Sequence, residues 1–385
     1  MRAGLIDHAV EFPPFEHLHL YEDLRGAFLN ISYSNVKPFI LREFRRDLPG
    51  DLELDWTDPG GLPDLRRLIA RRHAVAENHV LVTSGATEAY FLVNAALLRA
   101  GDRVVVDAPI YSPLRDSPRG FGAKVVSVPR DCRAGWTLDA DAWTRVSRPR
   151  ARAFVFANLN NPTSSALRRR ELREIADLAS DRGAYVVVDE TFREMARDPP
   201  PSVATFGPHG IALSTVTKLY GLGALRVGWV VAHPDVLEPL RGIKDYTTVA
   251  GSSLAQILAT WAIRQHASFA RRARGIVDRN RRLVAEHLDR MPGIHGEVPA
   301  SGTVFFPHSD VPVDRLARRL LQTYRTVIAP GRFFGMDDHF RIGLGGDTEE
   351  LRRGLGNLRR ALAELKGARA PPRTPRRSPR RARPR

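Results

Sequence analysis

Short runs of apolar and β-branched residues alternate with stretches of helical periodicity from about residue 79 onward. Seven of these runs predict strands, at 79–82, 103–107, 124–128, 152–157, 184–189, 211–214 and 226–232. Most of them are apolar without alternation, which indicates burial on both faces. Between two of them, Leu172, Ile175, Ala176 and Ala179 repeat at the spacing of one helix face. The pattern predicts an α/β fold with a mostly parallel seven-stranded sheet flanked by helices.

The pattern changes after residue 232, where arginine-rich stretches of helical periodicity lie near 252–290 and 349–366. Short strand candidates at 303–306 and 339–343 lie between them. We therefore expect a smaller α+β domain after the larger one. The predicted division is an N-terminal segment that packs with the small domain (1–48), a large α/β domain (49–280), a small α+β domain (281–366) and a disordered tail (367–385).

Length and composition restrict the class of protein. A chain of 385 residues, 43% of them hydrophobic, can bury more than one core. Its longest apolar stretches, such as 91–98, fall short of the roughly 20 residues that a membrane-spanning helix needs. Cys132 is the only cysteine, so neither an internal disulfide nor a cysteine-based zinc site can form. These observations predict a cytoplasmic protein with no membrane partner, and no metal site is expected.

The positive charge of the chain is concentrated at its end. The formal net charge is +16, and half of it comes from the last 19 residues, which carry eight arginines and no acidic residue. Their arginine, proline and serine content predicts disorder, because little apolar surface is available to offset the conformational entropy lost on ordering. An arginine-rich arm can bind nucleic acid through its phosphates. A solvated extension is the simpler interpretation, so no nucleic-acid partner is expected.

The strongest local signal for chemistry is the segment 214–229, STVTKLYGLGALRVGW, between two predicted strands. It places Lys218 in a loop rich in hydroxyl groups and glycine, with Arg226 eight residues later. A nearby cation and partial desolvation lower the pKa of an amine, which is what an imine-forming lysine needs. Considered alone, Lys218 is more simply explained as a surface lysine.

A second signal is the segment 83–98, in which a strand end is followed by Ser-Gly-Ala-Thr and an apolar helix. The backbone amides of Gly85, Ala86 and Thr87 can therefore bind an anion, such as a phosphate, at the helix N-terminus. The alternative is an ordinary glycine-containing turn between a strand and a helix.

Four further residues are candidates for a site. Asp189, Asn161 and Tyr111 each follow a predicted strand, where open α/β sheets bind their ligands. A buried Asp189 needs a cation or a proton, although it could instead cap a helix. Asn161 could equally serve an Asn-Pro-Thr turn, and Tyr111 could be a packed loop aromatic. Arg341, in a predicted strand of the second domain, suits bidentate binding of a carboxylate.

Across about residues 20–366 the chain resembles the fold type I pyridoxal 5′-phosphate (PLP) enzymes, specifically the class I and II aminotransferase family. The resemblance rests on the order of SGATEA, PxY, NPT, a strand-terminal DE, TK with an arginine eight residues later, and a late RIG. It implies the PLP-dependent transferase fold and a transaminase that moves an amino group between an L-amino acid and a 2-oxo acid. Residues 54–66 and 244–248 resemble dimer-interface segments, which implies a homodimer with shared active sites.

The same resemblance implies a role for each motif. Lys218 would bind PLP as an internal aldimine, Asp189 would pair with the pyridine nitrogen, and Tyr111 would stack on the ring. Asn161 would bond the phenolic oxygen of the ring and help to bind the substrate. Arg341 would bind the α-carboxylate of the substrate. The residues that would hold the phosphate are Gly85, Ala86, Thr87, Thr215 and Arg226.

Three positions depart from the pattern of the family. Phe192 stands where a tyrosine is usual, Trp56 stands where a phosphate-bonding tyrosine is commoner, and Ser164 replaces the glycine of NPTG. These changes leave open another PLP-dependent reaction of an amino acid, namely elimination, oxidation or cyclisation. A catalytically silent, aminotransferase-like regulator is a further alternative, although residues 1–48 are too short for a helix-turn-helix module of about 60 to 70 residues.

Overall fold

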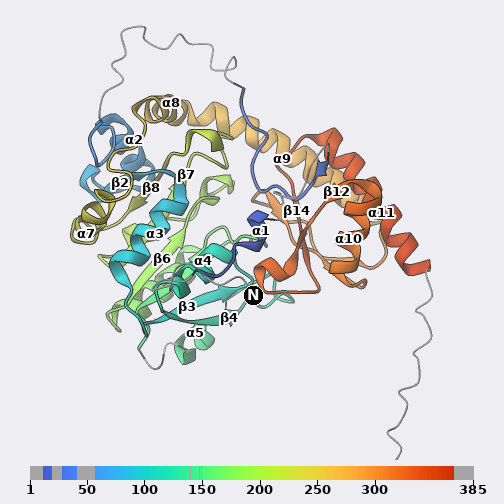
Figure 1. Ribbon diagram of the computed structural model, residues 1–385, viewed down its shortest axis with the longest axis horizontal. Helices are drawn as coiled ribbons and strands as arrows, with labels where there is room; N and C mark the ends of the chain where they lie inside the picture. Colours follow the sequence, from blue (N-terminus) through green and yellow to red (C-terminus); the bar gives the residue numbers. More distant parts are fainter. Residues whose placement is uncertain are drawn as a thin grey trace, which may run out of the picture.

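The computed structural model describes residues 12–19, 28–40, 57–138, 140–146, 148 and 150–367. These residues form two lobes, and the long helix α9 (His266–Leu288) runs from the larger lobe to the smaller one (Figure 1). The predictions for Trp56 and for residues 368–385 lie outside the described residues. No helix in the described ranges combines the length and the apolar character that crossing a membrane requires.

A seven-stranded sheet with the order β2-β8-β7-β6-β5-β3-β4 forms the centre of the larger lobe. Its strands are β2 (Val80–Thr83), β3 (Arg103–Ala108), β4 (Lys124–Pro129), β5 (Ala153–Ala157), β6 (Tyr185–Asp189), β7 (Gly210–Thr215) and β8 (Gly228–Val231). Strand β8 is antiparallel to both of its neighbours, and the other neighbouring strands are parallel. Each strand matches one predicted from an apolar run, so the predicted fold class is confirmed.

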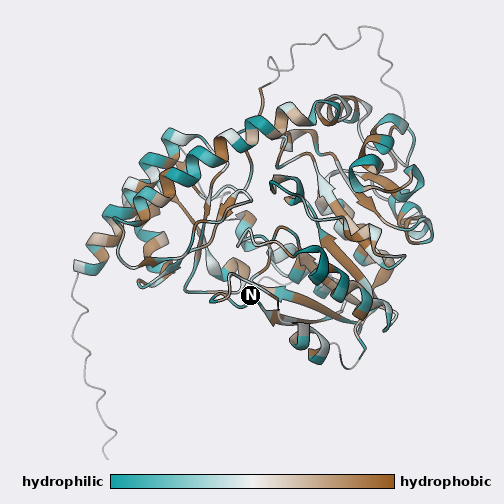
Figure 2. Ribbon diagram, turned by 180° about the vertical axis from the view of Figure 1, so that it is seen from behind, coloured by the Kyte–Doolittle hydropathy of each residue, from teal (hydrophilic) through white to brown (hydrophobic). Residues whose placement is uncertain are grey.

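Helices cover this sheet. They are α2 (Pro63–His73), α3 (Gly85–Leu97), α4 (Ser112–Gly120), α5 (Ala140–Val146), α6 (Arg169–Ser180), α7 (Pro234–Lys244) and α8 (Ser253–Arg264). The strands are mostly apolar, whereas the helices carry polar residues on their outer sides (Figure 2). On β3, Val105 belongs to one hydrophobic cluster and its neighbours Val104 and Val106 belong to another. The strand is thus buried on both faces, as its unbroken apolar sequence predicts.

The smaller lobe contains short strands and two helices. Its strands are β9 (Ile294–His295), β10 (Val304–Phe305), β11 (His308–Ser309), β12 (Thr326–Val327), β13 (Ala329–Pro330) and β14 (Phe340–Gly343), and its helices are α10 (Val313–Tyr324) and α11 (Thr348–Gly367). The candidates at 303–306 and 339–343 correspond to β10 and β14. The helical stretch predicted near 252–290 is two helices, α8 and α9, which meet at Gln265.

The described residues also form five single-turn helices. They are η2 (Glu77–His79), η3 (Arg193–Met195), η4 (Val203–Thr205), η5 (Gly223–Leu225) and η6 (Gly331–Phe334).

The N-terminal segment contacts both lobes. Strand β1 (Leu29–Asn30) pairs in parallel with β12 of the smaller lobe. Phe12, by contrast, packs against Phe121 of the larger lobe, with ring centroids 5.5 Å apart. The short helix α1 (Glu16–His19) lies between the lobes (Figure 1). The division of the chain into domains remains a prediction, and its boundary at residue 280 falls inside the continuous helix α9.

A buried ion pair fixes the loops at the carboxyl ends of β3 and β5. Nε of Arg130 donates to Oδ2 of Asp107 at 2.6 Å, and both side chains are fully buried. Asn160 donates to the same carboxylate oxygen at 3.1 Å, and Nη1 of Arg130 donates to the backbone oxygen of Trp136 at 3.1 Å. The pair therefore positions the turn that carries Asn161.

Removing one partner of this pair leaves the other charge buried without compensation. We expect Arg130→Met to lower the free energy of unfolding by about 3 to 5 kcal/mol. The double variant Asp107→Leu/Arg130→Met should recover much of this loss, because it removes both charges from the interior. Denaturant unfolding of the three proteins tests this expectation, and a double variant less stable than Arg130→Met alone would contradict it.

Candidate active site

A cleft of about 340 Å³ brings together nearly all of the residues that the sequence singled out. It is lined by nine of the ten predicted site residues, namely Ala86, Thr87, Tyr111, Asn161, Asp189, Thr215, Lys218, Arg226 and Arg341. The tenth, Gly85, begins helix α3 beside it. The strands β5, β6 and β7 end at this cleft because parallel strands carry their carboxyl ends to one edge of the sheet.

Lys218 lies three residues beyond the end of β7 and is partly buried. Its Nζ donates to Oγ of Ser34 at 2.9 Å and to Oδ1 of Asn35 at 2.6 Å. Burial, followed by the positive charge of Arg341, lowers the pKa of Lys218 to about 7. Near neutral pH a large fraction of the amine is therefore unprotonated, which is the form that attacks a carbonyl carbon.

The two adjacent carboxylates at the end of β6 point to opposite sides of the sheet, as successive strand residues do. Asp189 faces the cleft, and its Oδ1 accepts a hydrogen bond from the backbone amide of Thr191 at 2.9 Å. Burial raises the pKa of Asp189. Glu190 faces the interior, where it accepts from the amide of Val203 at 2.7 Å and lies 3.3 Å from Nδ1 of His73. Only Asp189 can meet a bound molecule.

The start of α3 and the guanidinium of Arg226 form a cradle for an anion. Gly85 has φ of +83°, and a Cβ at this position would lie 2.4 Å from Nη2 of Arg226. A side chain at Gly228 would lie 2.6 Å from the amide nitrogen of Ala86. Glycine at both positions allows the arginine and the strand to approach the turn closely. Free amides at a helix N-terminus and a guanidinium both favour an anion such as a phosphate.

The hydroxyl of Thr215, a predicted phosphate ligand, is hydrogen-bonded within the protein. This hydroxyl donates to the backbone oxygen of Val227 at 2.7 Å, and it lies 2.9 Å from the hydroxyl of Thr217. Both threonines line the cleft. Thr217, which was not predicted as a site residue, is therefore a second hydroxyl available on this wall.

Arg341 reaches the cleft from the smaller lobe. It is buried on β14, and its Nη1 donates to Oδ1 of Asn161 at 3.0 Å. Its Nη2 donates to the backbone oxygen of Ser32 at 3.0 Å. The turn itself is closed by Asn160, whose side chain accepts from the amide of Thr163 at 3.1 Å. Asn161 is consequently not needed for the turn and orients the guanidinium.

His17 of α1 is a cleft residue that sequence reasoning missed. Its Nε2 lies 3.2 Å from Nη2 of Arg341, and its ring stacks on Phe333 with centroids 5.3 Å apart. Burial, with the charges of Arg341 and Lys218, lowers the pKa of His17 to about 2. The neutral ring can therefore accept a hydrogen bond from the arginine. No periodic pattern in residues 1–48 marks it, so the sequence offered no signal.

Two of the departures from the family pattern can be followed in the structure. Phe192 is 3% exposed, and Nζ of Lys218 lies 5.4 Å from the centroid of its ring. It therefore lies beside the reactive amine and contributes no hydroxyl group. Ser164 has φ of +61°, and its hydroxyl donates to the backbone oxygen of Val304 at 2.7 Å. The serine thus occupies a left-handed conformation and links the two lobes.

A lysine and an aspartate at the carboxyl edge of such a sheet, with a second lobe that covers them, define the class: a PLP-dependent enzyme of fold type I. The family model of aminotransferase class I and II matches residues 46–358, and the chain belongs to this family. Capreomycidine synthase of Streptomyces vinaceus is 34% identical over 361 residues, which cover 89% of this chain and 91% of that protein.

Two solved structures are similar over nearly the whole chain. A PLP-dependent aminotransferase of Streptococcus suis has a TM-score of 0.87 at 26% identity, covering 92% of this chain and 99% of its own. The PLP-dependent cyclase OrfR has a TM-score of 0.85 at 29% identity, covering 94% of this chain and 100% of its own. The cofactor of this enzyme is therefore PLP.

The residues of the cleft fit PLP. The cradle at Gly85 and Arg226 suits its phosphate, and the raised pKa of Asp189 reflects a buried carboxylate that a protonated pyridine nitrogen would stabilise. Lys218 supplies an amine for its aldehyde. Tyr111 lines the same cleft and, with Phe15 at 5.8 Å between ring centroids, belongs to an aromatic wall.

The positive charge of Arg341 should control the protonation of Lys218. In cofactor-free protein, we expect Lys218 to be acylated by acetic anhydride with a midpoint near pH 7. Arg341→Gln should move this midpoint upward, because removing a neighbouring positive charge favours the protonated amine. Mass spectrometry of the digested protein measures the labelling of Lys218. The labelling of the exposed Lys37 in the same digest serves as a reference for the amount of active reagent at each pH. An unchanged midpoint would show that the two charges do not interact.

Proposed function

We propose that this enzyme transfers an amino group between an L-amino acid and a 2-oxo acid, with Lys218 as the residue that moves the proton. The observation that carries the proposal is the convergence, in one cleft, of an amine with a pKa of about 7, the buried carboxylate of Asp189 and the guanidinium of Arg341. A base, a partner for the pyridine nitrogen and a carboxylate-binding group are the three requirements of this reaction.

Arg341 binds the α-carboxylate of the substrate in this proposal. Its guanidinium is held on one side by Asn161 and on another by the backbone of Ser32, so its orientation is fixed before a substrate arrives. The neutral ring of His17 can accept a third hydrogen bond from Arg341, and it adds no positive charge that would repel the guanidinium. A preoriented guanidinium binds a carboxylate with less loss of side-chain entropy.

In this proposal Lys218 would remove the proton from Cα of the bound amino acid and hold it on Nζ for redelivery. PLP supplies the electron-withdrawing ring that makes this Cα proton acidic. Asp189 holds a proton on the pyridine nitrogen, and burial strengthens the interaction between the two charges. Gly85, Ala86 and Arg226 would hold the phosphate of PLP through backbone amides and a guanidinium.

We further propose that the enzyme is a homodimer with shared active sites. The support is the segment 244–248, which carries Tyr246, a large aromatic that is 93% exposed in the single chain. The same segment contacts the phosphate end of the cleft, because the hydroxyl of Thr248 donates to Glu88 at 2.6 Å. Glu88 in turn accepts from the amide of Ser84, next to Gly85. A partner covering Tyr246 would thus lie beside this end of the cleft.

Cyclisation of an amino acid is the second candidate function. Its support is the similarity to capreomycidine synthase at 34% identity and to the cyclase OrfR at a TM-score of 0.85. The reaction would begin with the same deprotonation by Lys218, after which a hydroxyl group would leave Cβ as water. A side-chain nitrogen would then bond to Cβ and lose a proton, and Cα would take a proton back. A neighbouring cavity of about 370 Å³ shares Phe15, Tyr111 and Asp189 with the cleft.

Product analysis distinguishes the two candidates. The holoenzyme is incubated with a panel of amino acids and 2-oxo acids, and separately with β-hydroxylated amino acids that carry a side-chain amine or guanidine. Transamination yields one new amino acid for each new 2-oxo acid. Cyclisation yields no 2-oxo acid and a product lighter by one water. We expect transamination. Formation of the cyclised product without any 2-oxo acid would overturn this proposal in favour of cyclisation.

The two carboxylates of the DE pair provide a matched test of the role of Asp189. Asp189→Ala should retain bound PLP but lose turnover by about 10²-fold or more, because a preorganised electrostatic partner is removed. Glu190→Gln changes the neighbouring carboxylate, which faces the interior, and should lower stability while preserving kcat. Cofactor content, kcat and thermal melting are measured for both variants. Near-normal turnover of Asp189→Ala would show that this residue only closes its turn.

A further inference from the structure

The smaller lobe carries a group of histidine and aspartate side chains outside the active-site cleft. His295 and His308 are directly opposite each other in the antiparallel register of β9 and β11. Their chain neighbours Ile294 and Ser309 are buried, whereas both imidazoles lie on the accessible face. Asp310 follows His308 by two residues and belongs to the same face. The pairing of two strands therefore places three metal-binding side chains together.

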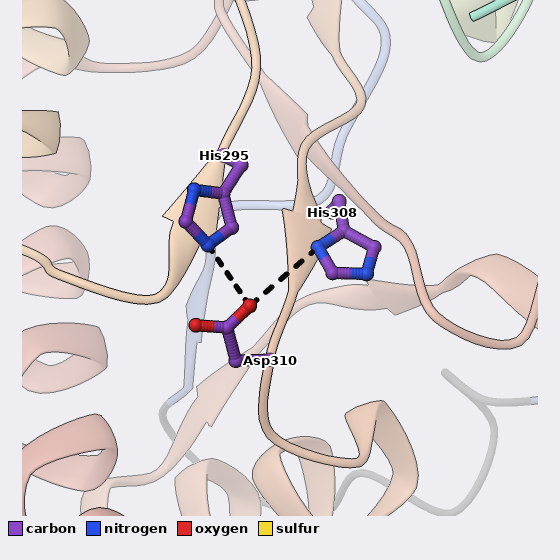
Figure 3. A group of neighbouring side chains, drawn as sticks. All are labelled: His295, His308 and Asp310. Atoms are coloured by element: carbon purple, nitrogen blue, oxygen red, sulfur yellow. Dashed lines mark hydrogen bonds and ion pairs between the residues drawn. The ribbon is translucent and has the colours of Figure 1, made fainter.

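The three side chains converge on one point. Nε2 of His295 lies 2.9 Å from Oδ1 of Asp310, and Nδ1 of His308 lies 3.9 Å from the same oxygen (Figure 3). All three potential ligand atoms lie within 4.8 Å of one another. Bonds of about 2.0 to 2.1 Å in a tetrahedral site separate ligand atoms by about 3.4 Å. The two distances to Asp310 bracket this value and the two histidine nitrogens lie no more than 4.8 Å apart, so side-chain rotations would bring the three atoms to coordinating positions.

The backbone beneath these residues is fixed by hydrogen bonds. The amide of Asp310 donates to the oxygen of Gly293, and the amide of Ser309 donates to the oxygen of Asp338, each at 2.9 Å. The second nitrogen of His308, Nε2, lies 3.7 Å from Oδ2 of Asp338. Asp338 is itself held by Nδ1 of His339 at 2.6 Å. The negative charge of Asp338 therefore lies close to the His308 ring without a hydrogen bond to it, and a negative charge beside a ligand favours the binding of a cation.

We propose that His295, His308 and Asp310 bind one divalent transition-metal ion, of the class represented by Zn²⁺. Two imidazoles and one carboxylate suit Zn²⁺, Co²⁺ or Ni²⁺, whereas Ca²⁺ and Mg²⁺ prefer oxygen ligands. Three protein ligands leave a fourth position for water. None of the three lines the cleft of Lys218, so the ion fastens the β9–β11 ribbon and takes no part in the reaction.

Lys366 at the end of α11 competes with the metal for Asp310. Its Nζ lies 3.8 Å from Oδ2 of Asp310 and donates to the backbone oxygen of Pro292 at 2.7 Å. A positive charge beside a ligand carboxylate opposes the binding of a cation. Lys366→Met should therefore bind Zn²⁺ more tightly than the wild-type protein does, a result that a merely hydrogen-bonded His295–Asp310 pair would not produce.

The test is calorimetric titration of Zn²⁺ into untagged, chelator-treated holoenzyme. The wild type should bind one Zn²⁺ ion more than the double variant His295→Ala/His308→Ala does. Binding of Zn²⁺ by PLP or by other histidines is the same in both proteins and is removed when the two titrations are subtracted. Asp338→Asn should weaken the binding of Zn²⁺, because it removes a negative charge beside the His308 ring. Zn²⁺ should also raise the melting temperature of the wild type, and not that of the double variant.

His233→Ala is the matched control, because His233 is also a partly exposed histidine beside an aspartate, 3.5 Å from Asp235, but lies in the larger lobe. It should bind Zn²⁺ as the wild type does. Retained visible absorbance of PLP shows that each variant is folded. Equal stoichiometry and affinity in the wild type and the double variant, or wild-type binding weaker than about 1 mM, would overturn the proposal. An unchanged affinity of Asp338→Asn would show that the charge of Asp338 does not act on the site.

Discussion

Three cationic side chains, Lys218, Arg226 and Arg341, share one cleft with a single buried carboxylate, Asp189. Desolvation of the amine, followed by the positive charges of Arg341 and Arg226, lowers the pKa of Lys218, while Asp189 acts in the opposite direction. The excess of positive charge in this cleft favours the binding of anions, namely a phosphate at one end and a carboxylate at the other. The sheet edge, the turn at Gly85 and the position of β14 all serve to hold these charges at fixed separations.

The N-terminal segment is the part of the chain that completes this arrangement. A Cβ at Gly343 would lie 1.8 Å from the backbone oxygen of Tyr33, and a Cβ at Gly345 would lie 2.3 Å from that of Asn35. The two glycines allow the segment to lie directly against β14 and the turn that follows it. This close approach brings Ser34 to Lys218 and Ser32 to Arg341. The base and the carboxylate-binding group are thus oriented by the same short stretch of backbone.

Sequence reasoning identified the residues that follow strands of the large sheet, because the apolar pattern of those strands is unambiguous. Lys218, Asp189 and Asn161 lie at strand ends that share one edge, so their proximity follows from parallel topology alone. His17 and Thr217 were missed for different reasons. His17 belongs to a four-residue helix without periodicity, and Thr217 was overlooked beside Thr215, whose hydroxyl is directed to the backbone of Val227.

The sequence by itself determined the large sheet, its flanking helices and the family, because these depend on local periodicity and on motifs whose spacing is fixed along the chain. Only the tertiary structure decided which carboxylate of the DE pair meets the cleft, which asparagine closes the turn and which orients Arg341. It also decided that His295 and His308 face each other across two strands. The physical reason is that these contacts join residues distant in sequence, and the register and packing that bring them together leave no periodic trace in the chain.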